Sequence, residues 1–344
     1  MDVLIPYRQM RSVFREILER NGFDKPQAET CAEIFAQNSL DGVNSHGVNR
    51  FARFVEMVWK GYVKPDQGPS LVHAAGAVEQ WNGNLGPGPA NALTATRRAM
   101  EIAAAHGVGC VGLANTNHWM RAGYYGWEAA RKGYAFIAWT NTLPNAPAWG
   151  ARDCRIGNNP LAMAAPYGSE AIVLDMAMTQ YSYGALEAYA MSGKKLPAPG
   201  GYDEDGALTI DPAAILQSQR PLPAGFWKGS GLAILLDVLA ALISGGDATC
   251  RIGRKEAEHG VSQVFIAIHV AGFPHFKHVE SAIVETIDYL HRSLPAHQGE
   301  KVFYPGERTL QKRKENTAKG IPVNARVWDE IVRLAAKPPA AYGG

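Results

Sequence analysis

Ser45, His46 and Arg50 are the residues whose types and spacing most directly suggest chemistry. They surround Gly47 between two segments with helical periodicity, so we expect His46 at a helix-to-helix junction and Arg50 in the first turn of the second helix. The positive end of a helix dipole disfavours a cation, whereas a guanidinium and a helix N-terminus both attract a carboxylate. The stretch therefore predicts an anion site beside an imidazole. The open alternative is a helix-capping His46 and a solvated Arg50.

A second histidine, His118, lies in an expected loop over 115–121, after an expected strand over 108–113. Open α/β sheets bind ligands at the carboxyl ends of their strands. His118 could polarise a carbonyl or stack on a ring, and the alternative is a loop histidine bonded to backbone. Joint metal ligation with His46 is a weaker hypothesis, because no third ligand follows at a close spacing.

Asp175 and the pair Trp227 and Lys228 are candidates for contacts with a nucleotide. Asp175 ends an apolar strand over 171–174, where it could bond ribose hydroxyls, orient a histidine or simply begin a turn. Trp227 and Lys228 precede a leucine-rich helix. There an indole could stack on adenine and an ammonium could meet phosphate, or a half-buried indole could lie beside a solvated lysine.

The usual fingerprints of nucleotide and hydrolase sites are missing from the sequence. Gly229-Ser230-Gly231 has two of the three glycines of a dinucleotide turn, but it follows a loop instead of a strand. No P-loop, HExxH or GxSxG pattern occurs. A standard Rossmann site is therefore not expected. The irregular stretch 150–160 is a long loop of the kind that often carries function.

Helical and strand periodicities alternate along most of the chain, which indicates a mixed α/β fold. Helices are expected at 7–21, from 25 onward, and at 51–60, 87–106, 122–132, 183–192, 232–244 and 279–290. Strands are expected at 71–73, 78–81, 108–113, 135–140, 161–165, 171–174 and 264–270, and a loop at 194–212. We expect a helical domain over 1–75 that 305–337 completes, an α/β domain over 76–304, and a disordered tail over 338–344.

The composition of the 344-residue chain is that of a globular enzyme, with 47% hydrophobic and 19% charged residues. The longest apolar run, 232–236, is shorter than the ~20 residues of a membrane span, so no membrane partner is expected. A net charge of +2 gives no field for nucleic acid, and the basic cluster 308–319 predicts a solvated helix face. The N-terminus shows no signal-peptide pattern, and four cysteines without CxxC spacing predict free thiols in the cytoplasm.

Six segments, taken together, resemble one known family. They are Ser45-His46-Gly47-Val48-Asn49-Arg50, Asn117-His118-Trp119-Met120, Gly157-Asn158-Asn159-Pro160, Asp175-Met176-Ala177, the stretch 223–229, and Pro305-Gly306-Glu307. In this order they are similar to the malate/L-lactate dehydrogenase family, which is unrelated to the Rossmann-type dehydrogenases. The resemblance runs from about residue 7 to residue 335, nearly the whole chain.

The resemblance implies a homodimer with a non-Rossmann nicotinamide-binding fold that uses NADH or NADPH, NADH being favoured, and no metal. The implied reaction is reduction of a 2-keto acid, foremost 2,3-diketo-L-gulonate to 3-dehydro-L-gulonate. Alternatives are a family member acting on malate, lactate, ureidoglycolate, sulfolactate or a cyclic imino acid, and a non-catalytic binding protein on the same fold.

By position, His46 and His118 match two candidate acid/base residues, and Arg50, Ser45 and His118 match substrate contacts. His46 is the expected proton donor, since an ordinary imidazole pKa of ~6.5 suits general acid catalysis. Cofactor contacts are implied for Ala171, Ile172, Val173, Leu174, Asp175, Met176, Ala177, Trp227, Lys228, Gly306, Glu307 and Arg308.

Two positions depart from the family. Much of it has Gly-Lys where this chain has Gly184-Ala185, which removes one cation near the site. The branch acting on diketogulonate commonly has Pro-Gly-His-Glu where this chain has Pro305-Gly306-Glu307-Arg308. The second departure leaves the preference between NADH and NADPH open.

Overall fold

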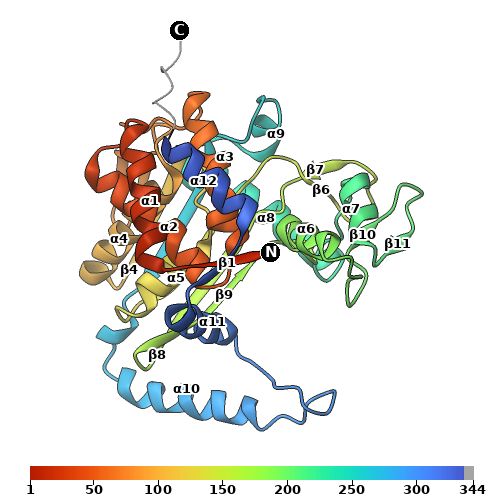
Figure 1. The fold of residues 1–344 in the computed structure, drawn as a ribbon. Coiled ribbons are helices and arrows are strands. Elements are labelled where there is room, and N and C mark those ends of the chain that lie inside the picture. The colour runs from red at the N-terminus through yellow and green to blue at the C-terminus, as the bar shows by residue number, and fades with distance from the viewer. Residues whose placement is uncertain (337–344) are drawn as a thin grey trace.

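A seven-stranded sheet forms the centre of the computed structural model, which describes residues 1–336 (Figure 1). The strands run in the order β2-β3-β4-β12-β5-β8-β9, and all neighbours in this sheet are antiparallel except β3 and β4. Their bounds are Ser70–Ala75 (β2), Val78–Asn82 (β3), Val108–Thr116 (β4), Val261–Ile268 (β12), Ala135–Thr140 (β5), Leu161–Tyr167 (β8) and Glu170–Met176 (β9). Rossmann sheets are mostly parallel, so the prediction of a mixed, non-Rossmann fold is confirmed.

Helices cover both faces of this sheet. α4 (Gly88–His106) and α5 (Ala122–Ala130) pack on one face, and α8 (Trp227–Ser244) packs on the other. The first face buries the larger apolar core, which includes Trp119, Tyr125 and Phe265. β12 is central and almost entirely buried, so the loops at the ends of β4 and β12 project from a rigid support.

A second layer is helical and contains α1 (Tyr7–Arg20), α2 (Lys25–Leu40), α3 (Val48–Trp59) and α12 (Ala325–Ala336). Phe14 and Phe51 stack at its centre with ring centroids 4.1 Å apart. β1 (Asp2–Ile5) pairs with β13 (Ile321–Asn324), so the first and last described segments meet in this layer. The division into a domain of 1–75 with 305–337 and a domain of 76–304 stays a prediction.

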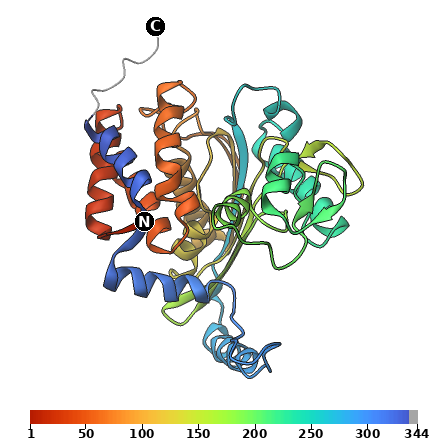
Figure 2. The same cartoon turned by 45° about the vertical axis from the view of Figure 1, so that its right-hand side comes forward.

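The remaining elements form a small lobe and a projecting arm (Figure 2). The lobe contains β6 (Ala146–Pro147), β7 (Cys154–Ile156), α6 (Tyr183–Met191), β10 (Gly201–Tyr202), β11 (Leu208–Thr209) and α7 (Pro212–Ser218). α10 (Phe276–His291) is the arm, which stands away from the sheet. Short helical connections are η1 (Asn44–His46), α9 (Thr249–Ile252) and η2 (Val270–Gly272). α11 (Glu307–Lys319) is longer and packs against α2 and β13.

Most expected elements form, and the corrections concern loops. β4 continues to Thr116, because the strand stays paired with β12 beyond the apolar run that predicted it. The expected loop 194–212 contains two short strands, β10 and β11, that pair with each other, and the expected loop 150–160 contains β7, which pairs with β6. The basic cluster forms α11, but Arg313 is bound to the buried Asp41 instead of being solvated. All four cysteines are free, as predicted, and the tail 338–344 lies outside the described residues.

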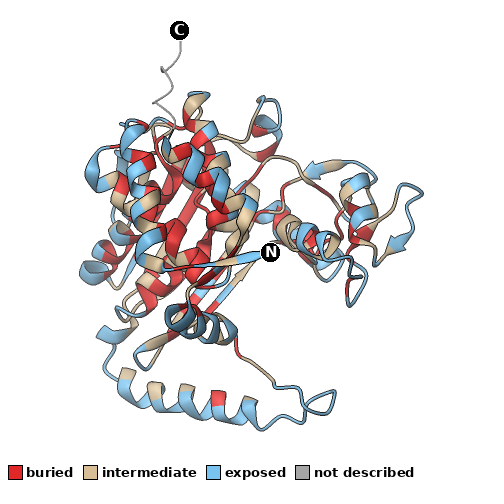
Figure 3. Ribbon diagram, viewed as in Figure 1, coloured by how far each residue is buried: buried red, intermediate tan, exposed pale blue. Residues whose placement is uncertain are grey.

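The centre of the sheet is buried, whereas the arm α10 is mostly exposed (Figure 3). One face of α8 is also exposed, and it is apolar. Ala233, Leu236 and Ala240 pack into the sheet, whereas six apolar side chains point outward. These are Leu232, Ile234, Leu235, Val238, Leu239 and Leu242. α8 is the one helix of residues 1–336 with the length and hydropathy of a membrane span. Asp237 in the middle of α8 accepts hydrogen bonds from Asn141 Nδ2 and the Thr249 backbone N–H, as expected of a helix that packs on a sheet.

Candidate active site

The junction that carries His46 is fixed by the end of α2. Ser39 Oγ accepts a hydrogen bond of 2.8 Å from the backbone N–H that opens α3. Asn38 Nδ2 donates to the His46 carbonyl at 3.0 Å. Gly47 has no space for a side chain, because a Cβ there would lie 2.2 Å from Ser39 Oγ. Two polar side chains and one glycine therefore set the backbone that presents His46.

The loop after β4 holds His118 in a similar way. The neighbouring Asn117 is 2% exposed, and its Nδ2 donates to three backbone carbonyls. They are those of Tyr62, Leu85 and Gly86, at 3.0, 2.8 and 3.0 Å. Because these carbonyls follow α3 and β3, the amide joins the helical layer to the sheet at the position of His118.

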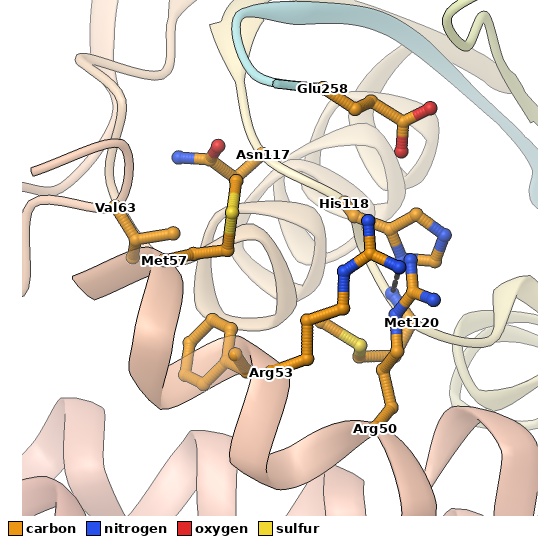
Figure 4. A pocket seen from close by; sticks show the side chains of 9 residues that line it. Arg50, Arg53, Met57, Val63, Asn117, His118, Met120 and Glu258 are labelled. Carbon is orange, nitrogen blue, oxygen red and sulfur yellow. Dashed lines mark hydrogen bonds between the residues drawn. The ribbon is translucent and has the colours of Figure 1, made fainter. Parts of the chain in front are cut away.

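The structure brings the two predicted histidines together. Their ring centroids are 5.8 Å apart, and the ring planes are inclined by 23°. His118 Nδ1 accepts a hydrogen bond of 3.0 Å from the Met120 backbone N–H (Figure 4). A backbone N–H only donates, so the neutral ring carries its proton on Nε2. Burial, with repulsion from Arg50 and His46, sets the pKa of His118 well below its usual range.

His46 has a more adaptable partner. Its Nδ1 lies 3.0 Å from Ser45 Oγ, and a hydroxyl can either donate to that nitrogen or accept from it. Burial lowers the pKa of His46 to about 4; Asp175 acts in the opposite direction, and Arg50 adds to the lowering. The expectation of an ordinary histidine pKa is therefore wrong for the pocket without a bound anion.

A buried ion network holds Asp175 near His46. Asp175 Oδ2 accepts a hydrogen bond of 2.8 Å from the backbone N–H of Gly123 and lies 3.4 Å from Arg121 Nε. Arg121 also pairs with Asp41 at 2.7 Å, and these two side chains are 8% and 1% exposed. Removing one charge from such a network is costly, because its partner stays buried. The network thus fixes a carboxylate that favours a protonated His46.

A pocket opens beside His118, between α3 and the loop before β12 (Figure 4). Arg50 and Arg53 extend into it from α3, and Glu258 faces them from the loop. The other lining residues are Phe54, Met57, Val63, Asn117 and Met120. Burial lowers the pKa of Arg50, and the charge of Arg53 lowers it further. The predicted carboxylate ligand, Arg50, thus lies in a pocket with His118.

Sequence reasoning missed Arg53 and Glu258. Arg53 follows Arg50 by three residues, and that spacing alone places both on one helix face. Glu258 has no comparable signal, because only the packing of the loop before β12 against α3 brings it here. Within residues 1–336, no group of three or more His, Cys, Asp or Glu side chains could hold a metal.

The predicted cofactor residues around Gly306 lie along β9. The Val173 backbone N–H donates to the Pro305 carbonyl at 2.9 Å. Gly306 has a positive φ of 96°, and a Cβ there would lie 3.2 Å from the Val173 backbone. Glu307 is bonded to His291 Nε2 at 2.9 Å, and Arg308 lies over the Phe303 ring. The start of α11 and the strand therefore form one surface.

Trp227 and Lys228 reach the same surface from its other end. Backbone hydrogen bonds join residues 178–180, just after β9, to residues 222–224, just before α8. The helix begins at Trp227, so both side chains belong to its first turn instead of preceding it. Trp227 is 66% exposed. Lys228 is exposed and forms no ion pair within residues 1–336.

These residues fit a nicotinamide dinucleotide. The side chains of Ile172 and Leu174 lie on the more exposed face of β9. The side chains of Ala171 and Val173 are buried, so these two residues can contact a cofactor only through their backbone atoms. An exposed indole offers a surface for a ring, and a lysine at a helix N-terminus suits phosphate. The same strand leads to Asp175, which acts on His46.

A family model described as malate/L-lactate dehydrogenase matches residues 5–332. A 2,3-diketo-L-gulonate reductase of Escherichia coli (strain K12 / DH10B) is 40% identical over 331 residues, which are 96% of this chain and 99% of that protein. A 2,3-diketo-L-gulonate reductase of Escherichia coli O7:K1 is also 40% identical over 331 residues, with the same coverage of both chains.

Solved structures share the fold over almost the entire chain. Malate dehydrogenase from Entamoeba histolytica superposes with a TM-score of 0.92 at 21% identity, covering 98% of each chain. Sulfolactate dehydrogenase from Methanocaldococcus jannaschii superposes with a TM-score of 0.88 at 26% identity, covering 97% of each chain. The family resemblance inferred from the sequence motifs is thereby confirmed.

Proposed function

Because the chain belongs to the malate/L-lactate dehydrogenase family of oxidoreductases, we propose that it reduces 2,3-diketo-L-gulonate to 3-dehydro-L-gulonate with NADH or NADPH, NADH being favoured. One observation carries the proposal. The largely buried guanidinium of Arg50 forms no ion pair within residues 1–336. It lines a pocket with His118, and the ring of His118 faces that of His46. Such a pocket suits a small anion with a carbonyl beside its carboxylate. The substrate is that of the 40% identical relative.

In this proposal each side chain has one task. Arg50 binds the carboxylate through two parallel hydrogen bonds and so directs the adjacent C2 carbonyl toward the histidines. His118 donates its Nε2–H to the carbonyl oxygen. His46 delivers the proton to that oxygen, since the Ser45 hydroxyl beside its Nδ1 can accept as well as donate and so permits a doubly protonated ring. When bound, the nicotinamide supplies the hydride, and the protein supplies position and charge.

The substrate itself prepares His46 for this task. In the free protein His46 has a pKa of about 4, with burial as the main cause and Arg50 among the charges that lower it. A carboxylate bound to Arg50 offsets that positive charge and adds a negative one nearby, which raises the pKa of His46. Asp175 acts in the same direction. The proton is therefore taken up mainly when substrate is bound.

The test of the proposed function is an initial-rate screen with NADH and with NADPH. The substrates are 2,3-diketo-L-gulonate, oxaloacetate, pyruvate, 3-sulfopyruvate, oxalurate and the cyclic imine Δ1-piperideine-2-carboxylate. We expect the highest kcat/KM for 2,3-diketo-L-gulonate. A higher value for another acid would assign the chain to a different branch of the family, and no turnover together with no nicotinamide binding would indicate a non-catalytic protein.

Lys228 is expected to bind the cofactor phosphates. Its exposed ammonium stands in the first turn of α8, whereas Gly229-Ser230-Gly231 does not form a Rossmann turn. Lys228→Ala should raise the apparent KM for the preferred nicotinamide by about 10-fold, since a hydrogen bond to a charged group contributes roughly 1.5–3 kcal/mol. The substrate KM and the circular dichroism spectrum should stay as in the wild type. An unchanged KM for both nicotinamides would remove Lys228 from the site.

The chain is proposed to be a homodimer in the cytoplasm. The exposed apolar face of α8 and the arm α10, where Val279 is 49% and Tyr289 79% exposed, present apolar surface that residues 1–336 do not cover. Contiguous patches of this kind on a protein surface usually mark an interface. A second copy fits best, because most soluble oligomers pair identical surfaces.

Charge placed on that face of α8 should separate the two copies. We expect the double variant Leu235→Asp and Leu242→Asp to sediment as a monomer of about 37 kDa, where the wild type sediments at twice that mass. Both residues are exposed in the single chain, at 58% and 69%, so its folding should be little affected. A variant that keeps the wild-type mass would place the interface elsewhere.

A further inference from the structure

The pocket wall that faces Arg50 contains an acceptor that the proposed reaction does not use. Glu258 Oε2 accepts a hydrogen bond of 3.1 Å from the Leu143 backbone N–H. No donor among residues 1–336 bonds to its Oε1. The carboxylate faces Arg50 and Arg53 (Figure 4), yet within the same residues it forms no ion pair of 4.0 Å or less with either. A gap therefore separates the two cations from an oriented carboxylate.

Burial and the neighbouring charges act on Glu258 in opposite directions. Burial raises the pKa of Glu258, and the Leu143 N–H and the two arginines act in the opposite direction. The lining of the pocket also includes the apolar side chains of Phe54, Met57 and Met120. A carboxylate at the end of such a space binds hydroxyl groups well, because it only accepts and a hydroxyl can donate.

We propose that Glu258 makes the enzyme select 2-keto acids that carry hydroxyl groups on the carbons beyond the keto acid, by accepting hydrogen bonds from those hydroxyls. The inference rests on the proposed function for one point, the placement of the substrate carboxylate at Arg50. From there the remainder of the substrate crosses the pocket to the facing wall, where Glu258 offers its free oxygen. Apolar side chains on the way contact the carbon skeleton.

The same carboxylate discriminates against two other kinds of keto acid. An alkyl chain would cover Glu258 without giving it a donor, and a buried acceptor left unpaired is unfavourable. A second carboxylate, as in a dicarboxylic keto acid, would meet like charge. One residue thus disfavours both keto acids with a long alkyl chain and dicarboxylic keto acids.

The proposal is tested with Glu258→Gln and with Glu256→Gln as the matched control. Glu256 lies in the same loop, is exposed and bonds to Tyr62 Oη instead of facing the pocket. For Glu258→Gln we expect kcat/KM on 2,3-diketo-L-gulonate to fall by about 10- to 100-fold, the range for a hydrogen bond to a charged group. On 2-oxobutyrate it should stay within about threefold, and on oxaloacetate it should rise. The control should match the wild type on all three.

A binding experiment separates this proposal from the proposed function. The rise in melting temperature is measured with L-gulonate and with hexanoate, two six-carbon acids that differ in their hydroxyls and need no turnover. The wild type should be stabilised more by L-gulonate, and Glu258→Gln should lose that difference. Absence of any preference in the wild type, or equal losses of the variant on all substrates, would overturn the role of Glu258. If the wild type binds L-gulonate preferentially but turns over no keto acid, the role of Glu258 is supported, and only the proposed reductase function is overturned.

Discussion

His46→Gln should lower kcat for the reduction by about 10²–10⁴-fold, the usual contribution of one general acid. Glutamine keeps the size and polarity of the side chain but has no proton to transfer at accessible pH. The ring of His46 lies 5.8 Å from that of His118, and Asp175 is close enough to favour its protonated form. The apparent KM for the nicotinamide should change little, because the proposed cofactor contacts lie along β9 and at the start of α8.

His118→Gln is the matched comparison. His118 Nδ1 is occupied by the Met120 N–H, so its ring offers one donor and cannot take up a second proton without losing that bond. A glutamine amide can also donate, and the variant should chiefly raise the substrate KM. If His118→Gln showed the large loss in kcat and His46→Gln did not, the proton would come from His118. Wild-type kcat in both variants would contradict the mechanism.

The pH profile of the wild type follows from the same side chain. Reduction needs a protonated donor, so activity falls as pH rises through the pKa of His46. In the free protein that pKa is about 4, and kcat/KM should therefore decline through the neutral range. The bound carboxylate raises the pKa in the complex, so kcat should decline only at higher pH. Both declines should disappear in His46→Gln and persist in His118→Gln.

Arg50→Lys should lower kcat/KM by about 10- to 100-fold, which corresponds to roughly 1.5–3 kcal/mol for a lost charge-assisted hydrogen bond. Lysine keeps the charge, but an ammonium cannot reproduce the planar pair of donors that matches a carboxylate. The loss should be much smaller for 2,3-butanedione, a diketone without a carboxylate. Equal losses on both substrates would show that Arg50 supports the structure and does not bind the carboxylate.

Arg53→Lys provides the control for this substitution. Arg53 extends from the same helix into the same pocket, but it is exposed and is not among the charges that lower the pKa of His46. Its exchange for lysine should change kcat/KM by a few-fold at most. A loss as large as that of Arg50→Lys would mean that the two guanidiniums share the carboxylate.

The parts of the site that could be predicted from the sequence are those set by neighbours along the chain. Apolar residues at helical spacing on both sides of Gly47 place His46 at a junction and Arg50 in the first turn of α3, as the structure has them. His118 follows a β-branched and aliphatic strand, so its place at the strand's end was also predictable. The non-Rossmann fold could be anticipated from the missing glycine turn.

The remainder depends on packing between distant segments. Glu258 reaches the pocket because the loop before β12 packs against α3. The sequence of neither segment predicts that contact. The network of Arg121 with Asp41 and Asp175 joins three elements that are far apart in the chain. The low pKa of His46 arises mainly from burial, which the residue type and its neighbours in sequence do not reveal.

The most direct test of the central claim is the position at which hydrogen enters the substrate. 2,3-Diketo-L-gulonate is incubated with the enzyme and NADH that carries deuterium at both C4 positions of the nicotinamide, and the product is examined by NMR. Because Arg50 holds the carboxylate and thereby presents the adjacent carbonyl, we expect one deuterium per product molecule, at C2 of 3-dehydro-L-gulonate. Deuterium at C3, or NADH oxidation without deuterated product, would contradict the account.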